Sequence, residues 1–196
     1  MKFFPNIITS IRLAAPFYFI FLIIIFKNQN TESLILFIIF LLLSISDYLD
    51  GYLARKFNIS SDYGKIFDPI SDKILTSSAL LYLSSINNNI LFPSLLIIFR
   101  EFLISGVREY SLLIRKGSIN VSMLSKIKTA LQFVTISLLL IAFGLDDNLF
   151  LEELIKNYKV IDYFIYSLWL VSFLTLYTGF QYCNNIYKNY RMEKLK

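Results

Sequence analysis

The chain has 196 residues, 56% of them hydrophobic, and 19 Lys and Arg against 14 Asp and Glu give it a formal net charge of +5. Soluble domains contain about 45–50% apolar residues, so this composition favours a membrane protein. The chain contains no His, which excludes His-based acid/base chemistry, phosphohistidine intermediates and ordinary zinc sites. With Cys183 as its single cysteine, the chain cannot contain a disulfide framework.

Apolar segments follow one another along the chain, and most approach the ~20 residues that a transmembrane helix needs. We expect them to be α-helices, because backbone groups inside lipid must form their hydrogen bonds within the segment. No stretch between them is long enough for a soluble module. We therefore expect one all-α polytopic membrane domain, residues 1–196, with six transmembrane helices and an amphipathic N-terminal start. The expected segments are 6–26, 33–54, 68–86, 91–114, 127–144 and 160–183.

Basic residues gather in alternate connections of this expected topology. They are frequent in 55–73, in 115–128 and in the C-terminal tail, and sparse in the other connections. The positive-inside rule then places both termini in the cytoplasm, and we expect a bacterial plasma membrane. Cations spread along one membrane face indicate attraction to anionic lipid headgroups rather than binding of nucleic acid.

Four aspartates stand at the cytoplasmic ends of the second and third segments. Asp47 and Asp50 are three residues apart, and Asp68 and Asp72 are four apart, so each pair shares one face of a helix. Four carboxylates brought together cannot all stay ionised without cations. Mg²⁺ and Mn²⁺ prefer such oxygen ligands, and two metal ions about 4 Å apart are a common arrangement for phosphoryl transfer.

The residues around these aspartates fit a phosphate-binding site. Gly51 and Gly64 would let a ligand approach the backbone closely, and Arg55 can hold a phosphate through two parallel hydrogen bonds. Asp68 precedes Pro69, a pair that suits a helix N-terminus with Pro at the first helical position. We therefore expect the third helix to begin there, and helix capping remains an alternative role for Asp68.

The pattern D-x2-D-G-x2-A-R-x8-G-x3-D-x3-D, which fills residues 47–72, resembles the signature of the CDP-alcohol phosphotransferases. This resemblance implies a six-helix membrane bundle, usually a homodimer, that binds two divalent cations, Mg²⁺ or Mn²⁺. It implies that Asp47, Asp50, Asp68 and Asp72 are metal ligands and that Asp72 is also the general base. It also implies a CDP site lined by Gly51, Ala54, Arg55 and Gly64.

The N-terminus resembles the start of one bacterial branch of this family. Pro5, Asn6, Thr9 and Arg12 match the P-N-x2-T-x2-R pattern of phosphatidylglycerophosphate synthases. By this resemblance, Asn6 and Thr9 face the CDP moiety. A capped helix start at the membrane interface is the alternative for each residue.

A second charged cluster lies in and after the fourth segment. Arg100, Glu101 and Arg108 interrupt an apolar run, where ionisable groups are expensive and indicate function. Lys126 and Lys128 follow at the start of the fifth segment, and the order again resembles the same synthases. We expect Arg108, Lys126 and Lys128 to bind the dianionic acceptor sn-glycerol 3-phosphate. The alternatives are lysines that only set topology and an internal ion pair of Arg100 with a glutamate.

Together these resemblances imply transfer of the phosphatidyl group from CDP-diacylglycerol to sn-glycerol 3-phosphate, with release of CMP. Inositol phosphate, serine and phosphatidylglycerol remain alternative acceptors, although serine lacks the phosphate that the cationic cluster favours. A cation transporter is a non-enzymatic alternative. It would need charges distributed across the bilayer depth, whereas the aspartates gather at one face.

Overall fold

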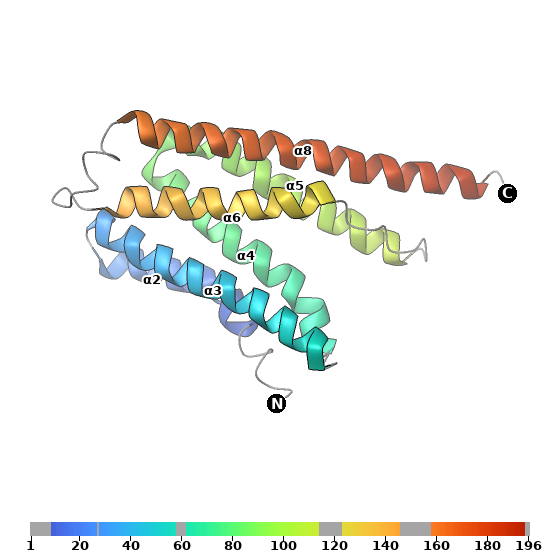
Figure 1. Cartoon of the computed structure of the whole chain (residues 1–196), viewed down its shortest axis with the longest axis horizontal. Coiled ribbons are helices and arrows are strands. Elements are labelled where there is room, and N and C mark those ends of the chain that lie inside the picture. The colour runs from blue at the N-terminus through green and yellow to red at the C-terminus, as the bar shows by residue number, and fades with distance from the viewer. Residues whose placement is uncertain (1–8, 27, 58–61, 114–122, 146–157, 195–196) are drawn as a thin grey trace.

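Figure 1 shows the computed structural model of the chain, which describes residues 9–26, 28–57, 62–113, 123–145 and 158–194. All regular elements in these ranges are helical, so the expected all-α class is confirmed. In chain order they are a helical turn over residues 9–13, α2 (Ala15–Ile25), α3 (Gln29–Phe57), α4 (Asp62–Ile86), the 3-10 helix η1 (Asn88–Ile90), α5 (Leu91–Leu113), α6 (Met123–Gly144) and α8 (Tyr158–Lys194).

Helix α4 lies in the middle of the bundle and contacts α2, α3, α5 and α6 (Figure 1). Many of its buried residues are small and polar, and hydroxyl groups such as those of Ser78 and Ser84 donate to carbonyls four residues earlier. Small side chains let neighbouring helices approach closely, and the hydroxyls stay satisfied within the helix itself. Because other helices cover it, α4 can be less apolar than a helix that faces lipid.

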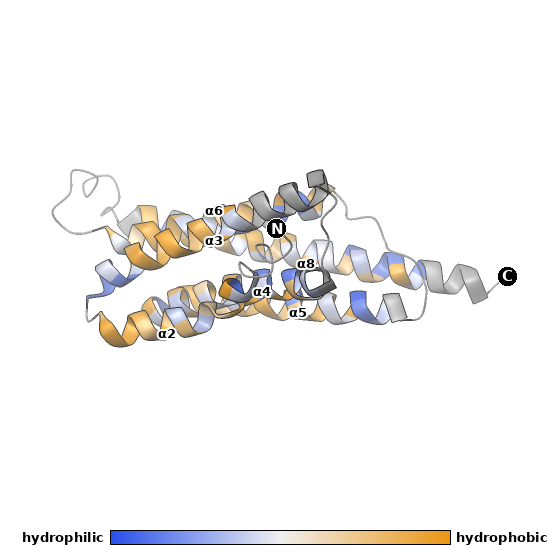
Figure 2. Ribbon diagram, turned by 90° about the horizontal axis from the view of Figure 1, so that it is seen from below, coloured by the Kyte–Doolittle hydropathy of each residue, from blue (hydrophilic) through white to orange (hydrophobic). Residues whose placement is uncertain are grey.

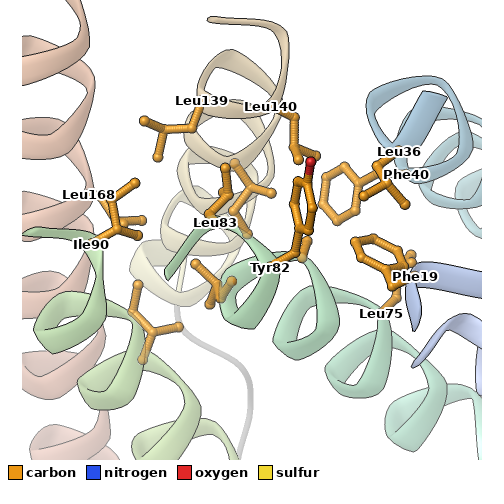
Figure 3. Packing of buried hydrophobic residues seen from close by; sticks show 14 of the residues in the cluster. Phe19, Leu36, Phe40, Leu75, Tyr82, Leu83, Ile90, Leu139, Leu140 and Leu168 are labelled. Carbon is orange, nitrogen blue, oxygen red and sulfur yellow. The ribbon is translucent and has the colours of Figure 1, made fainter. Parts of the chain in front are cut away.

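The hydrophobic core forms where five helices converge on α4 and one another (Figure 3). Leu75 and Leu83 of α4 are no more than 1% exposed and pack with Phe19 of α2 and Phe40 of α3. Tyr82 is also buried there, and its hydroxyl lies 2.8 Å from the Ser33 hydroxyl, so its polar atom has a partner. This core fixes how α2 and α3 sit against α4.

Within the described residues, four helices are long and apolar enough to cross a membrane, which agrees with a polytopic membrane protein. Helix α2 has 11 residues, so it spans about 16 Å, well short of the ~30 Å hydrocarbon core. Helix α4 is long enough to cross a membrane, but it is too polar to count as a membrane span by its composition. The expected total of six spans therefore stays a prediction. The four qualifying segments are Gln29–Ser46, Asn88–Ser111, Met123–Gly144 and Val160–Lys188.

The first expected segment, 6–26, is interrupted within the described residues. The helical turn over 9–13 ends at Ala14, and Pro16 lies in the first turn of α2. Because Pro has no backbone N–H, it is favoured where a helix begins rather than where one continues. The short N-terminal turn can therefore take its own direction against α4.

The expected start of the third helix at Asp68 is wrong. Helix α4 begins six residues earlier, at Asp62, and Pro69 lies inside it. Asp68 is therefore not a helix cap. The rings of Tyr63 and Phe67, one turn apart, are 4.5 Å apart, and Gly64 between them is buried. A side-chain pair at this spacing stabilises a helical turn, so the helix continues on the N-terminal side of Pro69.

The charged segments lie at one end of the bundle. The C-terminal ends of α3, α5 and α8 and the N-terminal ends of α4 and α6 all point to that end (Figure 1). Figure 2 shows hydrophobic residues concentrated on α2, α3 and α6 and hydrophilic residues on the C-terminal parts of α5 and α8. The fold thus gathers the aspartates and the cations of distant segments on one side of the apolar bundle.

The contact between α6 and α3 gives a test of this packing. A Cβ on Gly144 would lie 2.7 Å from Leu34 Cγ and 2.8 Å from the Leu34 backbone nitrogen. We expect Gly144→Ala to force the helices apart and to lower the free energy of unfolding by about 1–3 kcal/mol. Gly106→Ala is the matched control, because no atom lies within 4 Å of its Cβ position. Thermal unfolding in detergent would compare them, and equal melting temperatures would contradict this packing.

Candidate active site

The N-terminal turn meets the aspartates of α4. Thr9 and Arg12 are three residues apart and face α4, where Asp68 and Asp72 are four apart. Thr9 Oγ1 donates a hydrogen bond to Asp68 Oδ1 at 2.6 Å, and Arg12 Nη1 donates to Asp72 Oδ1. Arg12 Nη2 lies 3.8 Å from Asp68 Oδ1. One guanidinium group therefore bridges the two carboxylates.

The two sides of this ion pair differ in exposure. The Arg12 side chain is 1% exposed, whereas those of Asp68 and Asp72 are 49% and 41% exposed. A guanidinium group taken out of water needs compensating anions, and the two carboxylates supply them. The aspartates are thus held from the protein side while roughly half of each side chain remains accessible to a ligand.

The first aspartate pair is only partly described. Asp47 and Asp50 lie near the C-terminal end of α3, which packs against α4, but their side chains fall outside the described residues, as do those of Ala54 and Arg55. Among the described side chains, no group of three or more Asp, Glu, His or Cys could hold a metal ion. Asp68 and Asp72 contribute a carboxylate pair of the oxygen-donor kind that Mg²⁺ and Mn²⁺ prefer. Convergence of all four carboxylates stays a prediction.

The expected CDP-binding residues have different surroundings. Gly64 is buried in α4, one turn before Asp68, and Gly51 lies in α3. Thr9 is also buried and donates to Asp68, so it supports the carboxylate. Asn6 lies outside the described residues. A nucleotide role for these residues stays a prediction.

A second ionic cluster connects α5 and α6. Glu101 Oε1 accepts a hydrogen bond from Arg100 Nη1 at 3.1 Å and another from Lys128 Nζ. Arg100 and Lys128 are 8% and 4% exposed. The alternative that Arg100 forms an internal ion pair with a glutamate is therefore confirmed. Lys128 also has an internal partner and is more than a determinant of topology.

Lys73 connects the two clusters. It follows Asp72 on α4 and lies within electrostatic range of Glu101, Arg108 and Glu109. Lys128 is in turn within electrostatic range of Lys73. Lys128 thus contacts Glu101 directly and Lys73 lies within electrostatic range of both, whereas the side chains of Arg108 and Lys126 are exposed.

Three residues with evident roles here received no site assignment from the sequence. Arg12 was part of the N-terminal pattern, and its spacing of three residues from Thr9 could have identified it as a partner for the same helix. Lys73, next to an expected catalytic aspartate, could have been assigned to the cationic cluster. Thr178 of α8 accepts a hydrogen bond from Arg100, and no sequence signal indicates this.

A family model described as CDP-alcohol phosphatidyltransferase matches residues 2–177, a range that contains both ionic clusters. The chain belongs to the CDP-alcohol phosphatidyltransferase family. Membership confirms the resemblance carried by the spaced aspartates. It agrees with a membrane-embedded bundle in which helices bring the charged residues to one end.

Curated members of the CDP-alcohol phosphatidyltransferase family resemble the chain over most of its length. A protein from Rickettsia typhi is 36% identical over 183 residues, which are 93% of this chain and 96% of the relative. A protein from Bacillus subtilis is 32% identical over 191 residues, 91% of this chain and 92% of the relative. Both are named CDP-diacylglycerol–glycerol-3-phosphate 3-phosphatidyltransferase.

The bridging role of Arg12 can be tested by stability. We expect Arg12→Gln to lower the free energy of unfolding by about 1–3 kcal/mol, because two carboxylates lose a shared charged donor. Lys188→Gln is the control, since Lys188 is exposed on α8. Thermal unfolding of both variants in metal-free detergent buffer would measure the difference. If the Arg12 and Lys188 variants have the same melting temperature, the bridge contributes nothing to the stability of the fold.

Proposed function

We propose that this chain transfers the phosphatidyl group of CDP-diacylglycerol to sn-glycerol 3-phosphate, which gives phosphatidylglycerophosphate and CMP. The observation that carries the proposal is the half-exposed carboxylate pair of Asp68 and Asp72, fixed by Arg12 and Thr9 next to a cationic cluster. Support also comes from the names of the similar proteins in Rickettsia typhi and Bacillus subtilis.

Asp72 acts as the general base in this reaction. Its carboxylate takes the proton of the glycerol C1 hydroxyl while that oxygen attacks the phosphorus atom bearing the diacylglycerol. The new phosphorus–oxygen bond forms as the bond from that phosphorus to the CMP oxygen breaks, and CMP leaves. Arg12 holds Asp72 toward the reacting hydroxyl. The chain has no His, and the mechanism needs no covalent enzyme intermediate.

Asp47, Asp50, Asp68 and Asp72 would hold two divalent cations, Mg²⁺ or Mn²⁺. When bound, such ions neutralise the charge of a pyrophosphate group and stabilise a phosphate leaving group. Thr9 orients Asp68 for this purpose through its hydrogen bond. The CDP moiety is held by Asn6, Thr9, Gly51, Ala54, Arg55 and Gly64.

The cationic cluster provides the acceptor site. Arg108, Lys126 and Lys128 bind the phosphate of sn-glycerol 3-phosphate, and Lys73 joins them because it lies between this cluster and Asp72. A dianionic phosphate is attracted by several cations, and most strongly by the buried Lys128, because charges interact more strongly where the dielectric constant is low. In this proposal the acceptor phosphate binds on one side of Lys73 and the base lies on the other.

The protein works in a bacterial plasma membrane with both termini and the site on the cytoplasmic side, and as a homodimer. The orientation rests on basic residues such as Arg108, Lys126 and Lys188, which belong to the segments that meet where α5 and α8 finish and α6 begins (Figure 1). CDP-diacylglycerol reaches this end from the membrane with its acyl chains still in lipid.

An acceptor screen tests the activity. Purified protein with CDP-diacylglycerol and Mg²⁺ or Mn²⁺ should release CMP with sn-glycerol 3-phosphate but not with inositol phosphate, serine or phosphatidylglycerol. Asp72→Asn should lower kcat by about 10²–10⁴-fold, the usual contribution of a positioned general base. Release with another acceptor would agree with Asp72 as the general base but would reject Arg108, Lys126 and Lys128 as the site for sn-glycerol 3-phosphate. No release with any acceptor would favour cation transport.

Chelation tests the divalent cations. Addition of excess EDTA should abolish CMP release, and Mg²⁺ or Mn²⁺ added back should restore it, because four carboxylates and a pyrophosphate repel one another without cations. Ca²⁺ at the same concentration controls for ionic strength. Full activity of the chelated protein would reject the metal assignment of the aspartates.

A further inference from the structure

Arg100 crosses from α5 to α8 and lies against the backbone of the last helix. Its Nη2 donates a hydrogen bond to Thr178 Oγ1 at 3.0 Å. A Cβ on Gly179 would lie 3.0 Å from Arg100 Nε and 3.2 Å from Arg100 Cγ. Because residue 179 has no side chain, Arg100 can lie across α8 at this point. Thr178 and Gly179 also lie just beyond the range matched by the family model.

The other side of the same guanidinium reaches the acceptor cluster. Arg100 Nη1 donates to Glu101 Oε1, and this oxygen also accepts from Lys128 Nζ. A continuous chain of hydrogen bonds therefore runs from Thr178 of α8 through α5 to Lys128 of α6. Arg100 and Lys128 are more than nine-tenths buried, so water does not replace these partners.

Two buried cations share a single carboxylate in this hydrogen-bonded network, because the side chains of Arg100 and Lys128 both donate to one oxygen of Glu101. A purely structural ion pair would balance its charges, because an uncompensated charge among apolar helices is expensive. The surplus positive charge suits an anionic ligand. The hydrogen bond to Glu101 determines how far the ammonium group of Lys128 is free to bind that ligand.

We propose that α8 tunes the affinity for the acceptor phosphate, with Thr178 and Gly179 as positioning residues that act through Arg100 and Glu101 on Lys128. This inference rests on the proposed function. Without the Thr178 hydroxyl, Arg100 loses its partner on α8 and binds Glu101 more fully. The carboxylate then moves with Arg100, and the ammonium group of Lys128 shifts away from the acceptor.

Thr175 offers a matched control one turn earlier on α8. Both threonines are buried, and both donate to carbonyls of their own helix, but among the described residues only Thr178 accepts from Arg100. Thr178→Val should raise KM for sn-glycerol 3-phosphate about 5–10-fold, the scale of the net contribution of one typical hydrogen bond. Its kcat and its KM for CDP-diacylglycerol should stay within about twofold of wild type, as should all constants of Thr175→Val and Thr178→Ser.

Substitution of Gly179, with Gly106 as the control, tests the same contact of Arg100 with α8 by adding a methyl group. Gly179→Ala places a methyl group against Arg100 and should also raise KM for sn-glycerol 3-phosphate. Gly106→Ala, on α5 and with open space at its Cβ position, should leave every constant at the wild-type value. If Thr178→Val does not fold, the Gly179 and Gly106 variants decide by the same comparison, with the melting temperature of each recorded.

The outcomes separate the two proposals. Wild-type protein that releases no CMP with sn-glycerol 3-phosphate would overturn the proposed function and this inference with it. Active wild type with equal KM values for Thr178→Val and Thr175→Val would overturn the inference alone. So would a Thr178→Val variant in which the constants for both substrates change together with the melting temperature, because that pattern indicates a purely structural role.

Discussion

The charged end of this bundle depends on the pairing of buried cations with carboxylates. Arg12, Arg100 and Lys128 are each less than 10% exposed, and each contacts Asp68 and Asp72 or Glu101. Removing one partner would leave a charge in apolar surroundings, which costs several kcal/mol. These pairs therefore fix the N-terminal turn against α4 and α6 against α5. The ion pairs that stabilise these buried charges therefore also fix the positions of the functional groups.

Helix α4 makes both clusters possible because it is central and only moderately apolar. Its C-terminal part contributes Leu75 and Leu83 to the core, while its polar N-terminal part carries Asp68, Asp72 and Lys73. Small hydroxyl residues of α4, such as Thr76 and Ser78, let α5 and α6 pack closely against it. Their hydroxyl groups donate hydrogen bonds within α4 itself. A more hydrophobic α4 would resemble an ordinary lipid-facing span, but bulkier side chains would keep the neighbouring helices further apart.

The sequence was most informative where a short spacing controls geometry. The interval of four residues correctly placed Asp68 and Asp72 on one face of a helix, and the apolar runs predicted the long helices to within a few residues at most ends. The start of α4 was missed because the preference of Pro69 for a helix start does not exclude a helix that begins earlier, and the pair of Tyr63 and Phe67 stabilises the turn before it. Arg100 and Thr178 are 78 residues apart, and neither periodicity nor residue type indicates such a contact before the helices are packed.

The two clusters carry opposite surplus charge and meet at adjacent residues. Asp68 and Asp72 share one guanidinium, so this side is surplus negative and suits cations with a pyrophosphate. Two buried cations, Arg100 and Lys128, share the carboxylate of Glu101, so that side is surplus positive and suits a dianion. Asp72 and Lys73 form the boundary. In the proposed reaction, the acceptor hydroxyl must reach a base while its phosphate stays with the cations, and this boundary satisfies both requirements on a single turn of α4.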